Sequence, residues 1–594
     1  MILQALANYY NICVAKELVP PRGWDRVGIS VDVHLNPDGS VRRFVNVQHD
    51  ETRGKKTVQR PNVLVMPAPR IRAVNIAANF LWDNADYLLG IPTKGKVERT
   101  KKCFAASREL HNAVLSDTDS PAAHSIRAFF NTWDPDKFDE VEGASAVMPL
   151  LEKGANLTLC REDGTRFSED EEIRSAWTAR CSEEENGPED VCLVTGKHTE
   201  HIAVIHPKIK GIAGAQSTGA SLVSFNAPAF CSYGREQNAN APISHEAAFA
   251  YTTALNYLLD QPGNVMRMGI DTIVMWAQSA ETAYADFMSS LWNPDEKYNE
   301  GELRSILEKI CRGMPVSFDG EQLDSEMPFY ILGLSPNAGR VSVRFFLQNT
   351  FGKFVQNVNE HQENLRIAGY DHAEDKYIPT WKLLAATVNQ KSKNKNPLPQ
   401  LSGNLMTSIL TGTRYPTTLL TGVNLRIRAE RSIDHTKAAI LKAYYTRNVC
   451  PQVPKEILKM TLNKDSNNIP YLLGRLFSIY ESVQQCANPG IKATITARYF
   501  TSAASTPAIV FPVLGDLAQK HLRKLKGSPS TTGLAVHFER QIVDLGSRLG
   551  EQYPVRLSLP EQGSFQLGYY AQTQERYAKK NEPEVEAEKV PVQA

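Results

Sequence analysis

The spacing of apolar residues changes along this chain, and that change limits the folds available to it. Residues 28–35 (GISVDVHL) and 41–48 (VRRFVNVQ) alternate apolar and polar side chains around NPDG, a pattern typical of two antiparallel strands joined by a tight turn. Residues 329–334 (FYILGL) and 340–346 (RVSVRFF) flank SPNA and predict a second hairpin. Toward the C-terminus apolar residues recur at helical spacing instead, as over 471–486. The sequence therefore predicts an α+β fold, in which a large mixed N-terminal region with antiparallel hairpins precedes a C-terminal helical bundle.

Local composition divides the chain further. Residues 389–403 (NQKSKNKNPLPQLSG) are polar, basic and interrupted by proline, so we place a linker at 391–403. This leaves an N-terminal region over 1–390, which is one domain or two, and a C-terminal helical region over 404–575 with its bundle from about residue 471. The charged, proline-containing stretch 576–594 is predicted to be a disordered tail.

The cysteines and the apolar segments indicate the compartment. The nine cysteines are scattered and odd in number, which fits reduced thiols in a bacterial cytoplasm better than a disulfide framework. The first residues (MILQALANYY) have apolar side chains at helical spacing but lack the basic and long apolar regions of a signal peptide. Since no window approaches ~18 consecutive apolar residues, we expect a cytoplasmic protein without membrane segments.

Few segments carry the signatures of catalytic chemistry. TGKHT (195–199) has the Gly-Lys pair of a phosphate-binding loop but lacks its upstream glycine, and neither a G-x-S-x-G elbow nor an H-E-x-x-H helix occurs. One local cluster has metal-ligand atoms, at a spacing that matches no zinc-finger pattern: Cys181, Cys192, His198, His201 and His206. We therefore predict no catalytic residue, no cofactor and no metal, while a nuclease that uses these histidines stays an alternative.

Charges are separated into blocks, although their sum is a formal net charge of only +1. Residues 48–108 carry 12 Lys and Arg against 5 Asp and Glu, residues 134–190 carry 6 against 17, and residues 471–560 carry 10 against 5. Basic faces suit a phosphate backbone, although solvated loops and helix faces have the same composition. The candidate backbone-binding residues are Arg53, Lys55, Lys56, Arg60, Arg70 and Arg72 in the first basic block, and Lys520, Arg523, Lys524 and Lys526 in the second.

The segment 208–242 combines glycines with amide, hydroxyl and cationic side chains. Gly211, Gly214 and Gly219 permit positive φ and close backbone approach. Small backbone positions beside amides suit a duplex minor groove, where room is limited. A surface loop in which Gly and Asn only form turns is the other interpretation. The candidate DNA-binding residues are Lys208, Lys210, Gln216, Ser217, Thr218, Asn226, Arg235, Asn238 and Asn240.

Several long segments, in one order along nearly the whole chain, resemble a known family. They are MILQALANYY (1–10), NFLWDNADYLLG (79–90), CLVTG (192–196), the stretch 206–244, LGLSPNAGRVSVRFF (332–346), TWKLL (380–384) and the stretch 473–514. Together they are similar to the large subunit of the type I-C CRISPR Cascade surveillance complex. Segments of this length are far more specific than a short signature.

The resemblance implies a non-catalytic subunit for antiviral defence. Such a subunit recognises the protospacer-adjacent motif (PAM) in double-stranded DNA, promotes the duplex opening and R-loop formation that crRNA guides, and helps to recruit the helicase-nuclease. The implied partners are crRNA, target double-stranded DNA, the Cascade backbone and crRNA-processing subunits, and a small subunit made by internal translation. For the internal start, Met460 is the first candidate and Met406 the second. A scaffold that binds only protein subunits remains an alternative.

Overall fold

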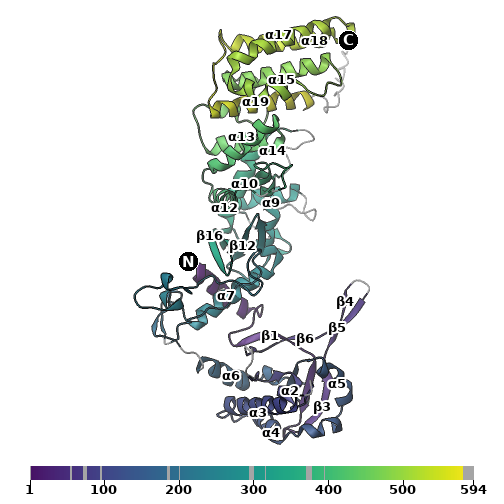
Figure 1. Cartoon of the computed structure of the whole chain (residues 1–594), viewed down its shortest axis with the longest axis vertical. Helices are drawn as coiled ribbons and strands as arrows, with labels where there is room; N and C mark the ends of the chain where they lie inside the picture. Colours follow the sequence, from purple (N-terminus) through teal and green to yellow (C-terminus); the bar gives the residue numbers. More distant parts are fainter. Residues whose placement is uncertain are drawn as a thin grey trace, which may run out of the picture. The chain divides into compact units, whose positions relative to one another are not determined.

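The computed structural model describes residues 2–53, 56–70, 76–93, 96–183, 187–199, 201–292, 300–314, 316–369, 377–393, 395 and 397–578. Its contacts divide the chain into two compact units, which we treat separately. Unit 1 comprises Met1–Ile209 and Ser221–Tyr257, and unit 2 comprises Lys210–Ala220 and Leu258–Ala594. Both units mix helices with antiparallel strands, and the last part of the chain is helical, so the predicted α+β class is confirmed (Figure 1).

A four-stranded sheet organises unit 1. Its order is β3 (Val41–Asn46), β2 (Val31–Leu35), β8 (Leu157–Arg161) and β7 (Trp82–Asp83). The antiparallel β2–β3 pair confirms the first predicted hairpin, whereas β2 pairs with β8 in parallel. All five residues of β2 are buried, as expected of a central strand covered on both faces.

Three two-stranded ribbons and a set of helices accompany this sheet in unit 1. β1 (Trp24–Ile29) pairs with β6 (Asn62–Pro67), β4 (His49–Arg53) pairs with β5 (Lys56–Arg60), and β9 (Asp190–Val191) pairs with β10 (His198–Thr199). The opening helix α1 confirms the predicted amphipathic segment and buries Leu6, Tyr9, Tyr10 and Cys13. The helices described in unit 1 are α1 (Ile2–Ala15), α2 (Ala85–Leu88), α3 (Val97–Val114), α4 (Pro121–Thr132), α5 (Ala144–Glu152), α6 (Glu171–Glu183) and most of α7 (His245–Asp260), whose last three residues belong to unit 2.

Unit 2 contains a second four-stranded sheet, in the order β11 (Val265–Met268), β12 (Asp271–Ala277), β15 (Pro328–Asn337) and β16 (Arg340–Thr350). The β15–β16 pair confirms the second predicted hairpin, with a bulge between Gly333 and Leu334. One sheet face packs against α8 (Ala283–Trp292) and α10 (Phe351–Leu365), where the rings of Phe329 and Phe351 lie 5.6 Å apart. A small ribbon, β13 (Val316–Phe318) with β14 (Glu321–Leu323), joins the same core.

The remaining helices of unit 2 continue this core into the predicted bundle. They are α9 (Glu300–Cys311), α11 (Thr380–Ala385), α12 (Pro399–Thr411), α13 (Thr417–Glu430), α14 (His435–Arg447), α15 (Ile469–Ala487), α16 (Ile495–Ser505), α17 (Pro507–Lys526), α18 (Pro529–Arg548) and α19 (Leu559–Ala578). α17 and α18 lie on one side of α15 and α19 on the other (Figure 1). α15 is buried almost all round rather than along one stripe, because it is the central helix.

Two predicted boundaries can be compared with these elements. The segment predicted as a linker, 391–403, lies inside unit 2, and α12 begins within it at Pro399. The compact units divide instead between Tyr257 and Leu258. The predicted tail begins as helix, since α19 ends at Ala578, and residues 579–594 lie outside the described residues.

Candidate nucleic-acid interface

Unit 1 contains an open cavity in the part of the glycine- and asparagine-rich segment that belongs to it. The cavity has a volume of about 660 Å³. Its walls come from residues 204–208, 221–228 and 231–238, which form little regular structure apart from two short 3₁₀ turns, Pro228–Phe230 and Gln237–Asn240. Polar backbone and side-chain atoms can therefore face the opening instead of being used in a sheet or helix.

His206 forms the inner end of this cavity. Its Nδ1 lies 2.8 Å from the hydroxyl of Tyr251 on α7, and both side chains are buried. Burial, with a smaller contribution from nearby His245, lowers the pKa of His206 to about 4. The imidazole is therefore neutral at neutral pH, and its hydrogen bond joins the cavity wall to α7.

Four of the predicted DNA-binding residues line this cavity: Lys208, Asn226, Arg235 and Asn238. The exposed Lys208 donates from Nζ to Ser221 Oγ at 2.7 Å. Arg235 forms an ion pair with Asp190 at 2.6 Å and donates to the carbonyl of Ala239 at 2.9 Å. The cavity thus offers one lysine bonded to a hydroxyl and one arginine already paired with a carboxylate.

The two asparagines that end the segment have different environments. Asn240 accepts from the backbone N–H of Ser232 at 2.8 Å and donates to the carbonyls of Arg235 and Gln237 at 3.1 and 2.9 Å. Both N–H groups of its amide are therefore used to hold the loop. Asn238 is 4% exposed and lines the cavity. Asn240 consequently braces the loop, whereas Asn238 is a buried residue of the cavity wall.

The remaining candidates of the segment lie in the stretch that belongs to unit 2. Gln216, Ser217 and Thr218 are exposed there, as is Lys210. Gln216 lies beside the β15–β16 turn, where a Cβ at Gly339 would be 3.4 Å from its Oε1. The predicted positive φ is confirmed at the glycines of this stretch, at 85° for Gly211, 80° for Gly214 and 95° for Gly219. The predicted site residues are therefore divided between the two units.

Exposed aromatic and apolar side chains accompany the polar ones, and the sequence analysis missed them. Tyr233 is fully exposed in a left-handed conformation (φ 56°) and precedes Gly234 at φ 71°. Ile205 is 74% exposed and Phe230 45% exposed. Exposed rings beside cations are typical of surfaces on which bases stack. The sequence signal was the SYGR motif (232–235), in which Tyr stands where a turn residue is expected.

The first basic block has intramolecular partners. The backbone of Arg53 lies opposite that of Lys56 in the β4–β5 register, and the Arg60 side chain forms an ion pair with Glu51 at 3.0 Å. The guanidinium of Arg70 lies 5.4 Å from the centre of the Trp177 ring. Lys55 and Arg72 lie outside the described residues. Among these side chains Arg60 and Arg70 thus contribute to the fold of unit 1.

The four candidate residues of the second basic block lie in the last two turns of α17. Lys520, Arg523, Lys524 and Lys526 are all exposed. Lys524 donates to Asn488 Oδ1 at 2.8 Å, and Lys526 forms an ion pair with Glu539 at 2.6 Å. Cations at a helix C-terminus also favour the helix dipole, so this cluster has a structural role as well as a potential phosphate-binding one.

The Cys and His residues that lie near one another in the sequence between 181 and 206 do not form a metal site in the described part of the chain. Among the described residues, no three His, Cys, Asp or Glu side chains are placed to hold a metal ion. Burial would raise the pKa of the Cys192 thiol, but hydrogen bonds from Ser244 and Thr195 outweigh burial and lower that pKa to about 7. The backbone N–H of Ser244 lies 3.3 Å from Cys192 Sγ. Cys192 therefore orders the turn that leads into α7.

The helices give no membrane span. Within the ranges that the structure describes, no helix is both long enough and apolar enough to cross a bilayer.

Comparisons with known proteins identify one family. Residues 6–577 match the family described as CRISPR-associated protein (Cas_Csd1). A comparison with curated proteins gives no match. The family match extends over both units and includes every candidate residue discussed above.

Proposed function

We propose a function for this chain from one premise: it belongs to the Cas_Csd1 family of CRISPR-associated proteins. It is accordingly a Cascade-type subunit. Our proposal is that it is the non-catalytic large subunit of a type I-C Cascade complex in the cytoplasm. In this role it recognises the PAM in double-stranded DNA, promotes crRNA-guided R-loop formation and helps to recruit the helicase-nuclease.

The unit 1 cavity is the observation that carries PAM recognition. Lys208 and Asn238 place a cation and an amide in the lining of one cavity, and the exposed ring of Tyr233 belongs to the same loop. Cations and amides are the groups that read a minor groove, whose acceptors differ little between base pairs. A protein that reads only a short element needs few such groups, because base pairing with the guide supplies the remaining specificity.

His206 does not support the nuclease alternative. His206 is buried and hydrogen-bonded to Tyr251, with a pKa that burial lowers to about 4. A general base has to reach its substrate and to titrate near the working pH. A measurement of DNA binding distinguishes PAM recognition from the scaffold alternative, in which the chain binds protein partners only.

The test measures binding of the assembled complex to PAM-bearing duplex. We expect Lys208→Ala and Asn238→Ala each to weaken binding by roughly 5- to 150-fold, the range for loss of one good base contact. Binding to a target with a pre-opened bubble should change less, because that substrate no longer needs the duplex to be read and opened. Lys153→Ala is the matched control, an exposed lysine of unit 1 away from the cavity.

Two results would count against the proposal. If both variants weaken the bubble and the duplex equally, the cavity contributes general affinity and reads no PAM. If neither variant changes duplex binding while the complex still assembles, the scaffold alternative is favoured.

A further inference from the structure

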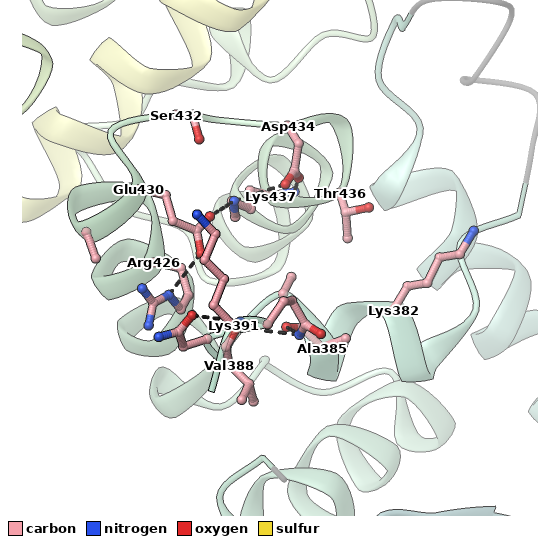
Figure 2. Close-up of a pocket in the computed structure, with 14 residues that line it drawn as sticks. Lys382, Ala385, Val388, Lys391, Arg426, Glu430, Ser432, Asp434, Thr436 and Lys437 are labelled. Atoms are coloured by element: carbon pink, nitrogen blue, oxygen red, sulfur yellow. Dashed lines mark hydrogen bonds and ion pairs between the residues drawn. The ribbon is translucent and has the colours of Figure 1, made fainter. Parts of the chain in front are cut away.

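Unit 2 has a pocket that is separate from the residues considered so far (Figure 2). Its volume is about 760 Å³, within the range of ligand pockets, about 300–1,000 Å³. The walls come from α11, the loop 386–391 that follows it, the end of α13 and the start of α14. All of its lining residues belong to unit 2.

The inner end of this pocket is a closed network of ion pairs. Lys437 lies 2.5 Å from Glu430 and 3.0 Å from Asp434, and Arg426 lies 3.2 Å from Glu430 (Figure 2). The Lys437 side chain is only 7% exposed. Two cations therefore neutralise two carboxylates, and neither carboxylate is left to repel an anion.

Lysines on the rim add positive charge that this network does not balance. Lys382 and Lys391 line the pocket and are exposed, and Lys393 and Lys395 follow within four residues of Lys391. Within the described part of the chain, none of these four lysines forms an ion pair. The pocket with its rim is thus a site for an anion with several charges, such as a run of phosphates.

Apolar and aromatic groups lie beside these cations. Ala385, Ala386, Val388 and Ala429 line the pocket. Trp381, the residue before Lys382 on α11, is 56% exposed, and Lys382 Nζ lies 5.7 Å from the centre of its ring. A large exposed ring beside lysines combines the two groups that bind unpaired nucleic acid, a stacking surface and a phosphate-binding track.

We propose that this pocket, with the lysines of 391–395 and Trp381, binds single-stranded nucleic acid. The phosphates lie along the lysines, and a base stacks on Trp381. Unpaired rather than duplex nucleic acid is the ligand because a base within a duplex already stacks on its neighbours and does not offer its face to a protein ring. The inference deepens the proposed function, on which it rests: the strand is one that the opened target exposes.

The experiment compares a fluorescent oligothymidylate with a blunt duplex of the same length, using the full chain without guide or PAM. We expect tighter binding to the single strand. Trp381→Leu should weaken that binding roughly 5- to 150-fold, whereas Trp381→Phe should retain most of it. Lys391→Ala with Lys393→Ala should make the salt dependence shallower, by about 0.7 per lysine on logarithmic axes. The matched control is Lys309→Ala with Lys459→Ala, two exposed lysines of the same unit.

Three outcomes would overturn the inference. The first is that the Trp381 and lysine variants bind the single strand as the control does. The second is that they lose duplex and single strand equally, which means general charge attraction. The third is that thymidine monophosphate competes as well as the oligonucleotide, which means a free-nucleotide site. Because no PAM is present, each result is independent of the test of the unit 1 cavity.

Discussion

The buried His111 shows how one residue makes the stability of unit 1 depend on pH. The ring lies between Phe80 and Phe130, with centroids 4.9 and 4.1 Å away. Nδ1 lies 2.7 Å from the Ser107 carbonyl, and Nε2 accepts the backbone N–H of Leu81 at 2.8 Å. This pairing fits the neutral ring with its proton on Nδ1, since a proton on Nε2 would face the Leu81 N–H.

We therefore expect acid to destabilise unit 1. Burial lowers the pKa of His111 to about 3, while its bond to Ser107 raises the pKa slightly. Between pH 6.5 and 3 the unfolded chain binds a proton that the folded chain does not, so the contribution is complete above pH 6.5 and decreases below it. The free energy of unfolding should fall by about 2 kcal/mol from pH 7 to 5 for this group alone.

Denaturant unfolding followed across that pH range measures the effect. His111→Gln removes the titrating group and should give a flatter pH profile, whatever its absolute stability. A profile as steep as that of the unaltered chain would assign the pH dependence to other groups.

At the scale of single residues, the sequence predicted which segment carries the polar side chains. It did not predict which of those side chains line the cavity and which hold the loop. Asn238 and Asn240 are indistinguishable in the sequence, yet one lines the cavity and the other holds the loop with three hydrogen bonds. That difference depends on a turn in which Tyr233 and Gln237 adopt positive φ. Non-glycine residues seldom do so, and no local pattern indicates it.

Among the elements, the contact between α15 and α19 depends on two glycines. A Cβ at Gly474 would lie 2.0 Å from the carbonyl oxygen of Phe565, and a Cβ at Gly568 would lie 2.2 Å from that of Tyr471. The obstacles are backbone atoms, which cannot rotate away. The two helices therefore approach more closely than any side chain at these positions would permit.

Gly474→Ala should therefore destabilise the bundle although alanine is the better helix former. We expect a loss of about 1–3 kcal/mol from overpacking. Gly533→Ala in α18 is the control, because a Cβ there meets nothing within 4 Å. That change should stabilise by up to about 1 kcal/mol through helix propensity. Thermal melting of the two variants checks the opposite signs, and equal shifts would contradict the glycine contact.

Strands and helices with a local pattern were predictable, and pairings between distant segments were not. Alternation around a turn predicted β2–β3, and two short strand-like runs around SPNA predicted β15–β16, since each partner is a few residues away. The parallel partner of β2 is β8, and Val31 lies beside Leu157. Nothing in either strand specifies that register, which depends on the helices between them. The stretch Lys210–Ala220 also looked continuous with the residues after it, whereas it belongs to unit 2.

For the molecule as a whole, the division into units separates groups that the sequence presented together. Lys208 and Asn238 belong to unit 1, and Gln216 to unit 2. The pocket with Trp381 is also in unit 2. A segment can therefore be predicted to bind nucleic acid from its composition while its residues serve two different surfaces, because composition does not indicate which core a segment joins.

The proposed internal start at Met460 also concerns the whole molecule, because it determines which helices the shorter product would contain. This residue is 39% exposed and follows the 3₁₀ turn Lys455–Ile457, in a stretch without helix that precedes α15. Translation from Met460 would produce α15 to α19 complete, with the Gly474 contact and the cations of α17 included. It would omit α14, whose Tyr445 packs against Gly563 of α19, so that face of α19 would be free for another subunit.

Expression of the gene with a C-terminal tag tests this prediction. We expect Met460→Leu to remove a short tagged product while the full-length chain remains, because leucine keeps the apolar side chain but its usual codons do not initiate translation. Met406→Leu is the matched control: that methionine is fully buried in α12, and a start there would add α13 and α14 to the product. A short product that persists in the Met460 variant and disappears in the Met406 variant would place the start before α13. The small subunit would then keep the helices that cover α19, and the free α19 face could not be its docking surface.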